Sequence, residues 1–234
     1  MKKDKVTYIM IFGLFAVYII LIIVAFFNLD NYSSVSASAL DNITIVLDAG
    51  HGGEDGGAVA NGIIEKDINL SITNKLCALF KTAGFNVKFT RTNDAMLNSE
   101  GSTLRERKLS DMKNRLSMFN SSEKNVVISI HQNKFTQEQY SGTQIFYSPN
   151  NENSAKLSEA IKENIVSLIQ PQNKRETKKA DNNIYLLYNA NVPAVIVECG
   201  FISNAQEALK LKDNDYQNKI AFAVFSGFLE YYNE

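Results

Sequence analysis

Apolar and polar positions alternate in blocks along the chain from residue 42 onward. Short runs dominated by valine, isoleucine and leucine are typical of strands buried on both faces, because such strands have no solvent-facing side that needs polar residues. The run 142–148 is a candidate edge strand, and 183–189 is a candidate short strand. The predicted strands are residues 43–50, 85–91, 125–131, 142–148, 183–189 and 193–201.

Between these runs, apolar residues recur every three or four positions, which predicts amphipathic helices. In the first of them, Ile68, Ile72 and Leu76 would share one face, and Gly84 follows its end. The alternation of helices with buried strands predicts an α/β fold with a largely parallel central sheet. The predicted helices are residues 67–80, 104–119, 154–169, 205–211 and 216–232.

Residues 1–40 have a different pattern and predict a signal or anchor segment with a linker. A lysine-rich start precedes an apolar run at residues 8–27. As a helix of about 1.5 Å per residue this run spans about 30 Å, the thickness of a bilayer core, and its basic flank predicts a cytoplasmic N-terminus. The linker contains Ala37-Ser38-Ala39, a candidate signal peptidase site. Both a retained membrane anchor and a cleaved signal peptide place residues 41–234 outside the cytoplasmic membrane.

Charge and cysteine content exclude several classes of protein. A formal net charge of −1 and a pI near 6.2 argue against a protein that binds nucleic acid by bulk electrostatics. Two cysteines are too few for a disulfide scaffold or a four-cysteine zinc module. They leave room for one disulfide, but the positions of Cys77 in a predicted helix and Cys199 at a strand end favour buried free thiols.

Polar side chains that could act in catalysis or bind a metal lie at the ends of three of the predicted strands. The first strand leads into Asp48 and His51, the third ends at His131, and the last contains Glu198. Parallel strands bring their carboxyl ends to one edge of a sheet, where ligands of such folds bind. We therefore expect these groups to converge, together with Glu65 at the start of the first predicted helix.

The histidines and Glu65 have structural alternatives. A single histidine at the end of a strand is usually a surface or core-edge residue. Glu65 could be an acidic first-turn residue that the helix dipole favours. Glu198, flanked by apolar residues, would be costly to bury without a partner, so a cation or a catalytic role is favoured. Together His51, Glu65 and His131 form a set of two histidines and one carboxylate, which suits catalytic zinc and also non-haem iron.

Other catalytic classes lack their motifs. The chain has no H-E-x-x-H, no G-x-S-x-G, and no lysine–serine/threonine pair after its glycine-rich loop, which argues against helix-based zinc proteases, serine hydrolases and phosphate-binding loops. Cys199 adjoins Glu198, but its position in a buried strand suits packing more than nucleophilic attack.

The chain resembles the zinc-dependent N-acetylmuramoyl-L-alanine amidases, the amidase type 3 family, over residues 43–232. The motifs that carry the resemblance are LDAGHGG, EKDINL with Glu65, SIHQN and VECGFISN. The resemblance implies one zinc ion per chain bound by His51, Glu65 and His131, and Glu198 as the catalytic carboxylate. It also implies a twisted mixed sheet of about six strands with helices on both faces, and residues 41–234 as the catalytic domain.

The resemblance also implies a reaction and a setting. The expected reaction is hydrolysis of the amide bond between N-acetylmuramic acid and L-alanine in peptidoglycan. The chain looks most like the CwlD-type amidases of spore-forming bacteria, which act in the spore cortex on the way to muramic δ-lactam. Some members of the family need an activating protein partner. Two alternatives stay open, another exported metallohydrolase of glycan (a deacetylase or esterase) and a non-catalytic wall-binding module.

The sequence also suggests roles for several residues outside the predicted metal site. Arg115 and Asn120 match a helix position that the family favours and are expected to be structural. Gln132 stands where the family often has a small residue and is a candidate for substrate contact. The glycines at 52 and 53 are expected to let the glycan approach the metal, and the acids at 54 and 55 lie near it. The basic segment 171–181 is expected to be a solvated loop, with a partner or an anionic glycan as the alternative.

Overall fold

The computed structural model describes Ile19 and residues 43–97 and 99–233. The predicted signal or anchor segment, with its apolar run and its candidate cleavage site, lies outside these residues apart from Ile19. Among the residues described, no helix is both long and apolar enough to cross a membrane.

Strands and helices alternate along residues 44–233, as the pattern of apolar positions predicts. The strands are β1 (Thr44–Ala49), β2 (Val59–Ala60), β3 (Ile63–Ile64), β4 (Asn86–Phe89), β5 (Asn125–Asn133), β6 (Gln144–Tyr147), β7 (Lys178–Lys179) and β8 (Ala194–Phe201). The helices are α3 (Glu65–Thr82), α4 (Leu104–Phe119), α5 (Asn153–Leu168), α6 (Tyr185–Asn189), α7 (Ala205–Lys212) and α8 (Asn214–Asn233).

The main sheet has six strands in the order β4-β1-β5-β8-β6-β7. Its first four strands are parallel, β6 runs antiparallel to β8, and β7 runs parallel to β6. The predicted α/β fold with a mixed, largely parallel sheet of about six strands is therefore confirmed. The carboxyl ends of β1, β5 and β8 lie side by side, which is the edge where ligands of such sheets bind.

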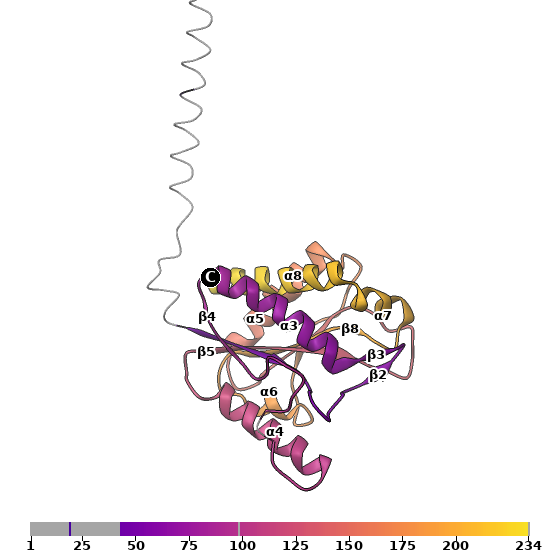
Figure 1. Cartoon of the computed structure of the whole chain (residues 1–234). Helices are drawn as coiled ribbons and strands as arrows, with labels where there is room; N and C mark the ends of the chain where they lie inside the picture. Colours follow the sequence, from indigo (N-terminus) through magenta and orange to yellow (C-terminus); the bar gives the residue numbers. More distant parts are fainter. Residues whose placement is uncertain (1–18, 20–42, 98, 234) are drawn as a thin grey trace, which may run out of the picture. The chain divides into compact units, whose positions relative to one another are not determined.

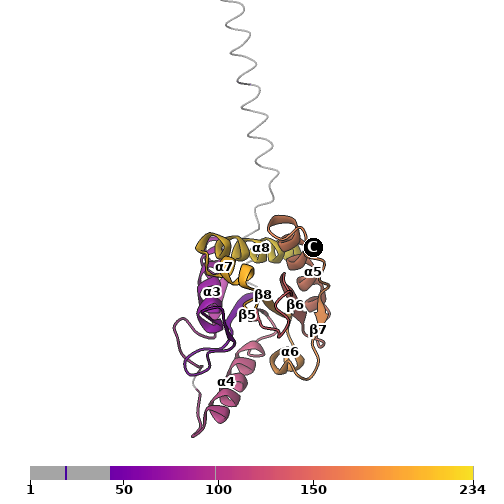
Figure 2. The same ribbon diagram turned by 90° about the vertical axis from the view of Figure 1, so that its right-hand side faces the viewer.

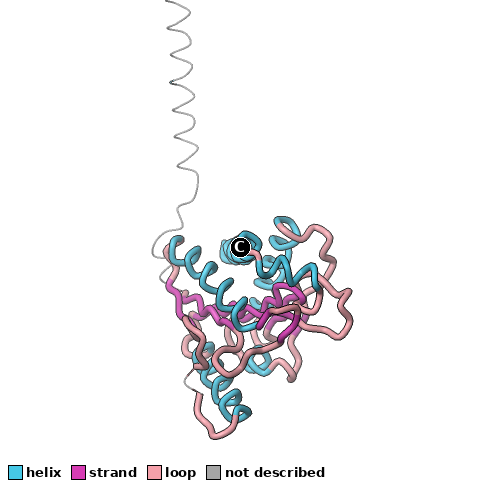
Figure 3. Tube along the Cα trace, turned by 45° about the vertical axis from the view of Figure 1, so that its right-hand side comes forward, coloured by secondary structure: helices cyan, strands magenta, loops and turns pink. Residues whose placement is uncertain are grey.

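Helices cover both faces of this sheet (Figures 1 and 2). Inward-facing side chains of β1 alternate between the two layers, because successive residues of a strand point to opposite faces. Ile45 and Leu47 join the larger core with α3, α5 and α8, whereas Val46 joins the smaller core with Phe119 of α4 and Leu187 of α6. Figure 3 shows the strands running between these two groups of helices.

Three local predictions differ from the structure. Residues 183–189 form the short helix α6 and not a strand, since the Tyr188 amide donates to the Ile184 carbonyl at 2.9 Å and closes a helical turn. The strand within 142–148 is not at the edge, because β7 pairs with its outer side. Strand β7 lies in the segment 171–181, which was expected to be a loop.

Candidate metal centre and active site

The predicted site residues come from separate elements that meet at the carboxyl edge of the sheet. His51 follows β1 by two residues and has a left-handed backbone, with φ of 61°. Glu65 is the first residue of α3. His131 and Glu198 are register partners on the neighbouring strands β5 and β8. The structure thus brings together the four residues that the family resemblance assigns to the site, whereas Asp48, which was also expected to converge there, lies elsewhere.

Three of these side chains form a compact cluster. The Nε2 of His51 lies 3.3 Å from Oε2 of Glu65, and the Nδ1 of His131 lies 3.0 Å from Oε1 of the same carboxylate. The candidate ligand atoms of the three residues all lie within 4.8 Å of one another. Two imidazole nitrogens and a carboxylate are a donor set that suits catalytic zinc, so these residues fit such an ion.

Backbone and side-chain donors fix the Glu65 carboxylate. The amide of Ala58 donates to Oε2 at 2.8 Å, and the amide of Gln132 donates to Oε1 at 3.1 Å. Asn69 donates to Oε1 through Nδ2 at 3.3 Å. Burial opposes ionisation of Glu65, but the hydrogen bonds and charges of the two histidines outweigh it and hold its pKa well below the usual range.

Asp55 and Arg115 hold His51 from its outer side. Its Nδ1 lies 2.8 Å from Oδ2 of Asp55, and Nη2 of Arg115 donates to its carbonyl at 2.7 Å. Burial lowers the pKa of His51, but the carboxylates of Asp55 and Glu65 outweigh it and raise the pKa to about 9. With Nδ1 committed to Asp55, the Nε2 atom is the one that faces the cluster.

Glu198 lies next to the cluster but forms no hydrogen bond with its three residues. The Oε2 atom of Glu198 is buried and has no hydrogen-bond partner among the described residues. Burial raises the pKa of Glu198 to about 7, with the charge of His131 acting in the opposite direction. A buried carboxylate without a partner is costly, so this atom marks a position where a cation or a reacting group would be expected.

Two glycines, Gly50 and Gly57, make room for the cluster. A Cβ atom on Gly50 would lie 2.2 Å from the ring of His131, and one on Gly57 would lie 2.6 Å from Oε2 of Glu65. Gly52 and Gly53 pack against the backbone of Ala95 and the following residue, so the structure gives their lack of a side chain a role in loop packing. The approach of a glycan at these glycines stays a prediction.

Asp48 lies in β1, the strand that leads to His51, but it takes no part in the cluster. It is fully buried, and its Oδ1 lies 2.5 Å from Nη1 of Arg115. The hydroxyls of Thr90 and Ser129 donate to its two oxygens at 2.7 and 2.5 Å. The expected structural role of Arg115 is confirmed, since its guanidinium ties α4 to the end of β1.

Three other residues of the sequence analysis have structural partners. The carboxylate of Glu54 pairs with the Arg107 guanidinium. Gln132 is buried and donates to Oδ1 of Asn69 at 3.2 Å, which is a structural contact, and its contact with substrate stays a prediction. Asn120 donates to the Asn189 carbonyl at 3.1 Å, and both cysteines are free and buried, as expected.

Fold and site together define the class of the protein: an α/β protein with a candidate metal centre at the carboxyl edge of a largely parallel sheet. The family model described as N-acetylmuramoyl-L-alanine amidase matches residues 45–230. The chain belongs to this family, and the resemblance that its motifs indicated is confirmed.

Individual relatives and solved structures agree with this assignment. The chain is 34% identical over 210 residues to the germination-specific N-acetylmuramoyl-L-alanine amidase of Bacillus subtilis, covering 89% of this chain and 87% of the relative. The structure of the CwlD amidase from Clostridioides difficile in complex with the GerS lipoprotein is similar with a TM-score of 0.78 and 43% identity, over 81% of this chain and 98% of that one. The catalytic domain of CwlV, an amidase from Bacillus (Paenibacillus) polymyxa, is similar with a TM-score of 0.67 and 27% identity, over 82% and 98%.

Proposed function

We propose that this chain hydrolyses the amide bond between N-acetylmuramic acid and L-alanine with one zinc ion held by His51, Glu65 and His131. The observation that carries the proposal is the unpartnered carboxylate oxygen of Glu198 beside a cluster of two histidines and a carboxylate. A wall-binding module would gain nothing from such a carboxylate, because burying it without a partner destabilises the fold.

In this mechanism Glu198 moves the proton. When bound, zinc would supply a Lewis acid that polarises the carbonyl and acidifies water. Glu198 accepts a proton from the attacking water, the new C–O bond forms, and the C–N bond breaks as Glu198 passes the proton to the leaving L-alanine nitrogen. Its pKa near neutrality suits both halves of this transfer, because a group of that pKa gains and loses a proton with similar ease.

The relatives support a setting in the spore cortex. The B. subtilis relative is described as germination-specific, and the C. difficile neighbour is a CwlD amidase. We infer that this chain acts outside the cytoplasmic membrane on cortex peptidoglycan, where removal of the peptide leaves a muramic acid carboxyl group that can close to the δ-lactam. Residues 1–40 would then act as the export signal or anchor, and residues 41–234 as the catalytic domain.

A protein partner is part of this proposal. The neighbouring CwlD amidase was solved with the GerS lipoprotein, which supports an activating partner for this chain as well. Such a partner would be expected to favour the loop conformation that holds His51, since this residue lies outside regular secondary structure.

Product analysis of digested peptidoglycan tests the proposed function. Purified protein loaded with zinc is expected to release stem peptides with free L-alanine amino termini, and the Glu198→Ala variant is expected to release none. Release of acetate in place of peptides would identify a deacetylase. Unchanged binding to peptidoglycan without any product would identify a wall-binding module.

A further inference from the structure

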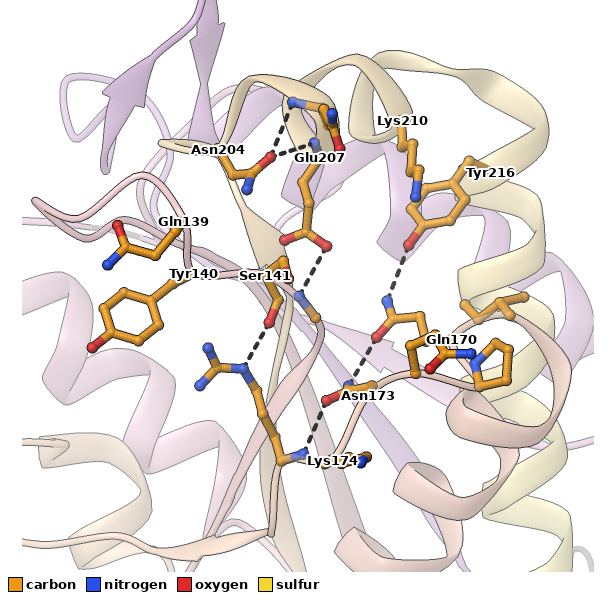
Figure 4. A pocket seen from close by; sticks show the side chains of 16 residues that line it. Gln139, Tyr140, Ser141, Gln170, Asn173, Lys174, Asn204, Glu207, Lys210 and Tyr216 are labelled. Atoms are coloured by element: carbon orange, nitrogen blue, oxygen red, sulfur yellow. Dashed lines mark hydrogen bonds between the residues drawn. The ribbon is translucent and has the colours of Figure 1, made fainter.

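A pocket of about 730 Å³ lies between the loop that joins β5 to β6, the segment after α5, and the start of α7. Figure 4 shows Tyr140 and Ser141 on one side of this pocket and Lys210 and Tyr216 on another. Three basic residues line it, and no mechanistic role has been given to any of them. They are Lys174, Arg175 and Lys210.

The acidic residue of the lining, Glu207, does not neutralise these charges for a ligand. Its Oε1 accepts the amide of Gly142 at 2.9 Å, and its Oε2 accepts the amide of Phe201 at 2.8 Å. The carboxylate is also buried. Because its oxygens are used to join the end of β8 to the neighbouring loop, the open pocket presents positive charge.

Arg175 is held in place by one nitrogen and two ring faces. Its Nε donates to the Ser141 carbonyl at 2.8 Å, and its Cζ lies 4.7 Å from the ring centre of Phe201 and 5.7 Å from that of Tyr140. Its Nη1 and Nη2 atoms have no hydrogen-bond partner among the described residues. A guanidinium fixed in this way with its terminal nitrogens free is suited to bind a carboxylate through two hydrogen bonds.

The position of Arg175 relative to Glu198 follows from strand β8. Phe201 lies three residues beyond Glu198 on that strand, which corresponds to about 10 Å at about 3.3 Å per residue. Gln144, the register partner of Glu198, donates through Nε2 to the carbonyl of Glu176 at 2.6 Å. The segment that carries Arg175 therefore runs beside β6, which is the neighbour of β8 in the sheet.

The charge of the pocket selects one part of the substrate. N-acetylated sugars carry no charge, whereas the stem peptide carries carboxylates beyond its first residue. Three extended residues span about 10 Å, which is also the length of β8 from Glu198 to Phe201, the residue whose ring lies 4.7 Å from the Arg175 guanidinium.

We propose that Arg175, with Lys174 and Lys210, forms a subsite for the carboxylates at the second and third residues of the stem peptide. The proposal rests on the proposed amidase function. In this arrangement the guanidinium holds the leaving peptide, and the amide bond of L-alanine lies at Glu198. The subsite makes the enzyme select anionic stem peptides over amidated ones.

Kinetics with paired substrates test this subsite. The substrates are muropeptides with a full stem peptide whose carboxylates at the second and third residues are either free or amidated. Wild-type enzyme is expected to hydrolyse the free form with a kcat/KM about tenfold to a hundredfold higher. The Arg175→Gln variant is expected to lose this preference, because its kcat/KM falls much more on the free form than on the amidated form.

A matched control is the Lys178→Gln variant, which removes one positive charge from the same segment outside the pocket. It is expected to keep the wild-type preference. An Arg175→Gln variant with an unchanged preference, or with equal losses on both substrates, would overturn the proposal. The second result would show that Arg175 only supports the fold.

A binding measurement keeps the subsite separate from the proposed function. Free stem tripeptides with free or amidated carboxylates are titrated by calorimetry into zinc-loaded wild type and the Arg175→Gln variant. Tighter binding of the anionic tripeptide to wild type alone supports the subsite, even if no peptidoglycan is hydrolysed. Equal affinities in all four titrations would overturn the subsite, even if the amidase activity is present.

Discussion

The Nδ1 atom of His51 lies 2.8 Å from Oδ2 of Asp55, and the opposite nitrogen of the same ring faces Glu65. Asp55 is itself fixed, since its Oδ1 lies 2.8 Å from Nζ of Lys108 and accepts the amide of Gly57 at 3.2 Å. A carboxylate that takes the outer nitrogen of a metal-binding histidine sets the tautomer and the orientation of the ring. We infer that Asp55 positions His51 in this way.

The first prediction concerns this pair. The Asp55→Ala variant is expected to bind zinc about 10- to 100-fold more weakly, because the ring of His51 loses the group that orients it. Competition with a chromogenic zinc chelator measures the affinity directly and needs no substrate.

The neighbouring residue supplies the control for Asp55. Glu54 is exposed and pairs with Arg107, so the Glu54→Ala variant removes an acid from the same loop without touching His51. It is expected to keep the wild-type affinity. Equal losses in the two variants would show that zinc binding depends on the charge of the loop and not on the hydrogen bond to His51.

The second prediction compares two glycines with the same backbone conformation. Gly57 has φ of 68° and Gly62 has φ of 67°, so an alanine at either position costs about 1–2 kcal/mol of backbone strain. Only at Gly57 would the new Cβ lie 2.6 Å from Oε2 of Glu65, whereas at Gly62 the nearest atom is Nζ of Lys212 at 3.3 Å.

The two variants should therefore differ in metal content. Gly57→Ala is expected to lose zinc on dialysis against a weak chelator, and Gly62→Ala is expected to retain it. Elemental analysis gives the zinc per chain, and thermal unfolding of the metal-free proteins compares the strain. Full zinc retention by Gly57→Ala would contradict the assignment of Glu65 as a ligand.

The sequence predicts most of the fold because its strands are buried on both faces. Runs such as 125–131 and 193–201 stay apolar until a polar residue ends them, and this pattern leaves little choice of structure. The prediction of a strand at residues 183–189 was wrong because the aromatic and leucine residues of this segment also suit a strand. One turn of helix forms there because only Leu187 has to be buried, and Asn120 binds the carbonyl at its end.

The candidate site was predicted less completely than the fold. Polar residues at strand ends identified the positions of His131 and Glu198, but the same rule also selected Asp48, which points into the interior to meet Arg115. The roles of Asp55 and Gly57 depend on how the loop before α3 folds. Its hairpin of β2 and β3 has only two residues in each strand, too few for an alternating pattern to appear in the sequence.

The third prediction separates proton transfer from metal binding. The Glu198→Gln variant is expected to keep its zinc, since Glu198 makes no hydrogen bond to the cluster, and to lose at least about a hundredfold in kcat. Glu163→Gln on the exposed face of α5 removes an equal charge far from the chemistry and is expected to match wild type. Loss of zinc from Glu198→Gln would instead assign Glu198 to the metal site.

The fourth prediction concerns the buried pair of Asp48 and Arg115. Asp48→Asn removes one of the two carboxylates that pair with the buried Arg115, whose Nε keeps Asp111 at 2.7 Å, so it is expected to destabilise the fold by about 1–3 kcal/mol at pH 7. Urea unfolding followed by circular dichroism measures the free energy of unfolding. Asp67→Asn, at an exposed position in the first turn of α3, is the control and is expected to change that free energy by less than about 1 kcal/mol.

The same pair predicts a dependence on pH. Burial raises the pKa of Asp48, but Arg115, His131 and two hydroxyls outweigh it and hold the folded-state pKa below the ordinary value of 3.8. Above 3.8 both the folded and the unfolded chain carry Asp48 ionised, so its contribution to stability is fully present. As the pH falls from 3.8 through the folded-state pKa, the unfolded chain takes up the proton first and the contribution is lost.

The difference in unfolding free energy between wild type and Asp48→Asn should therefore stay constant from pH 7 to about pH 5 and shrink below 3.8. A difference that grows on acidification would contradict an ionised Asp48 in the folded protein.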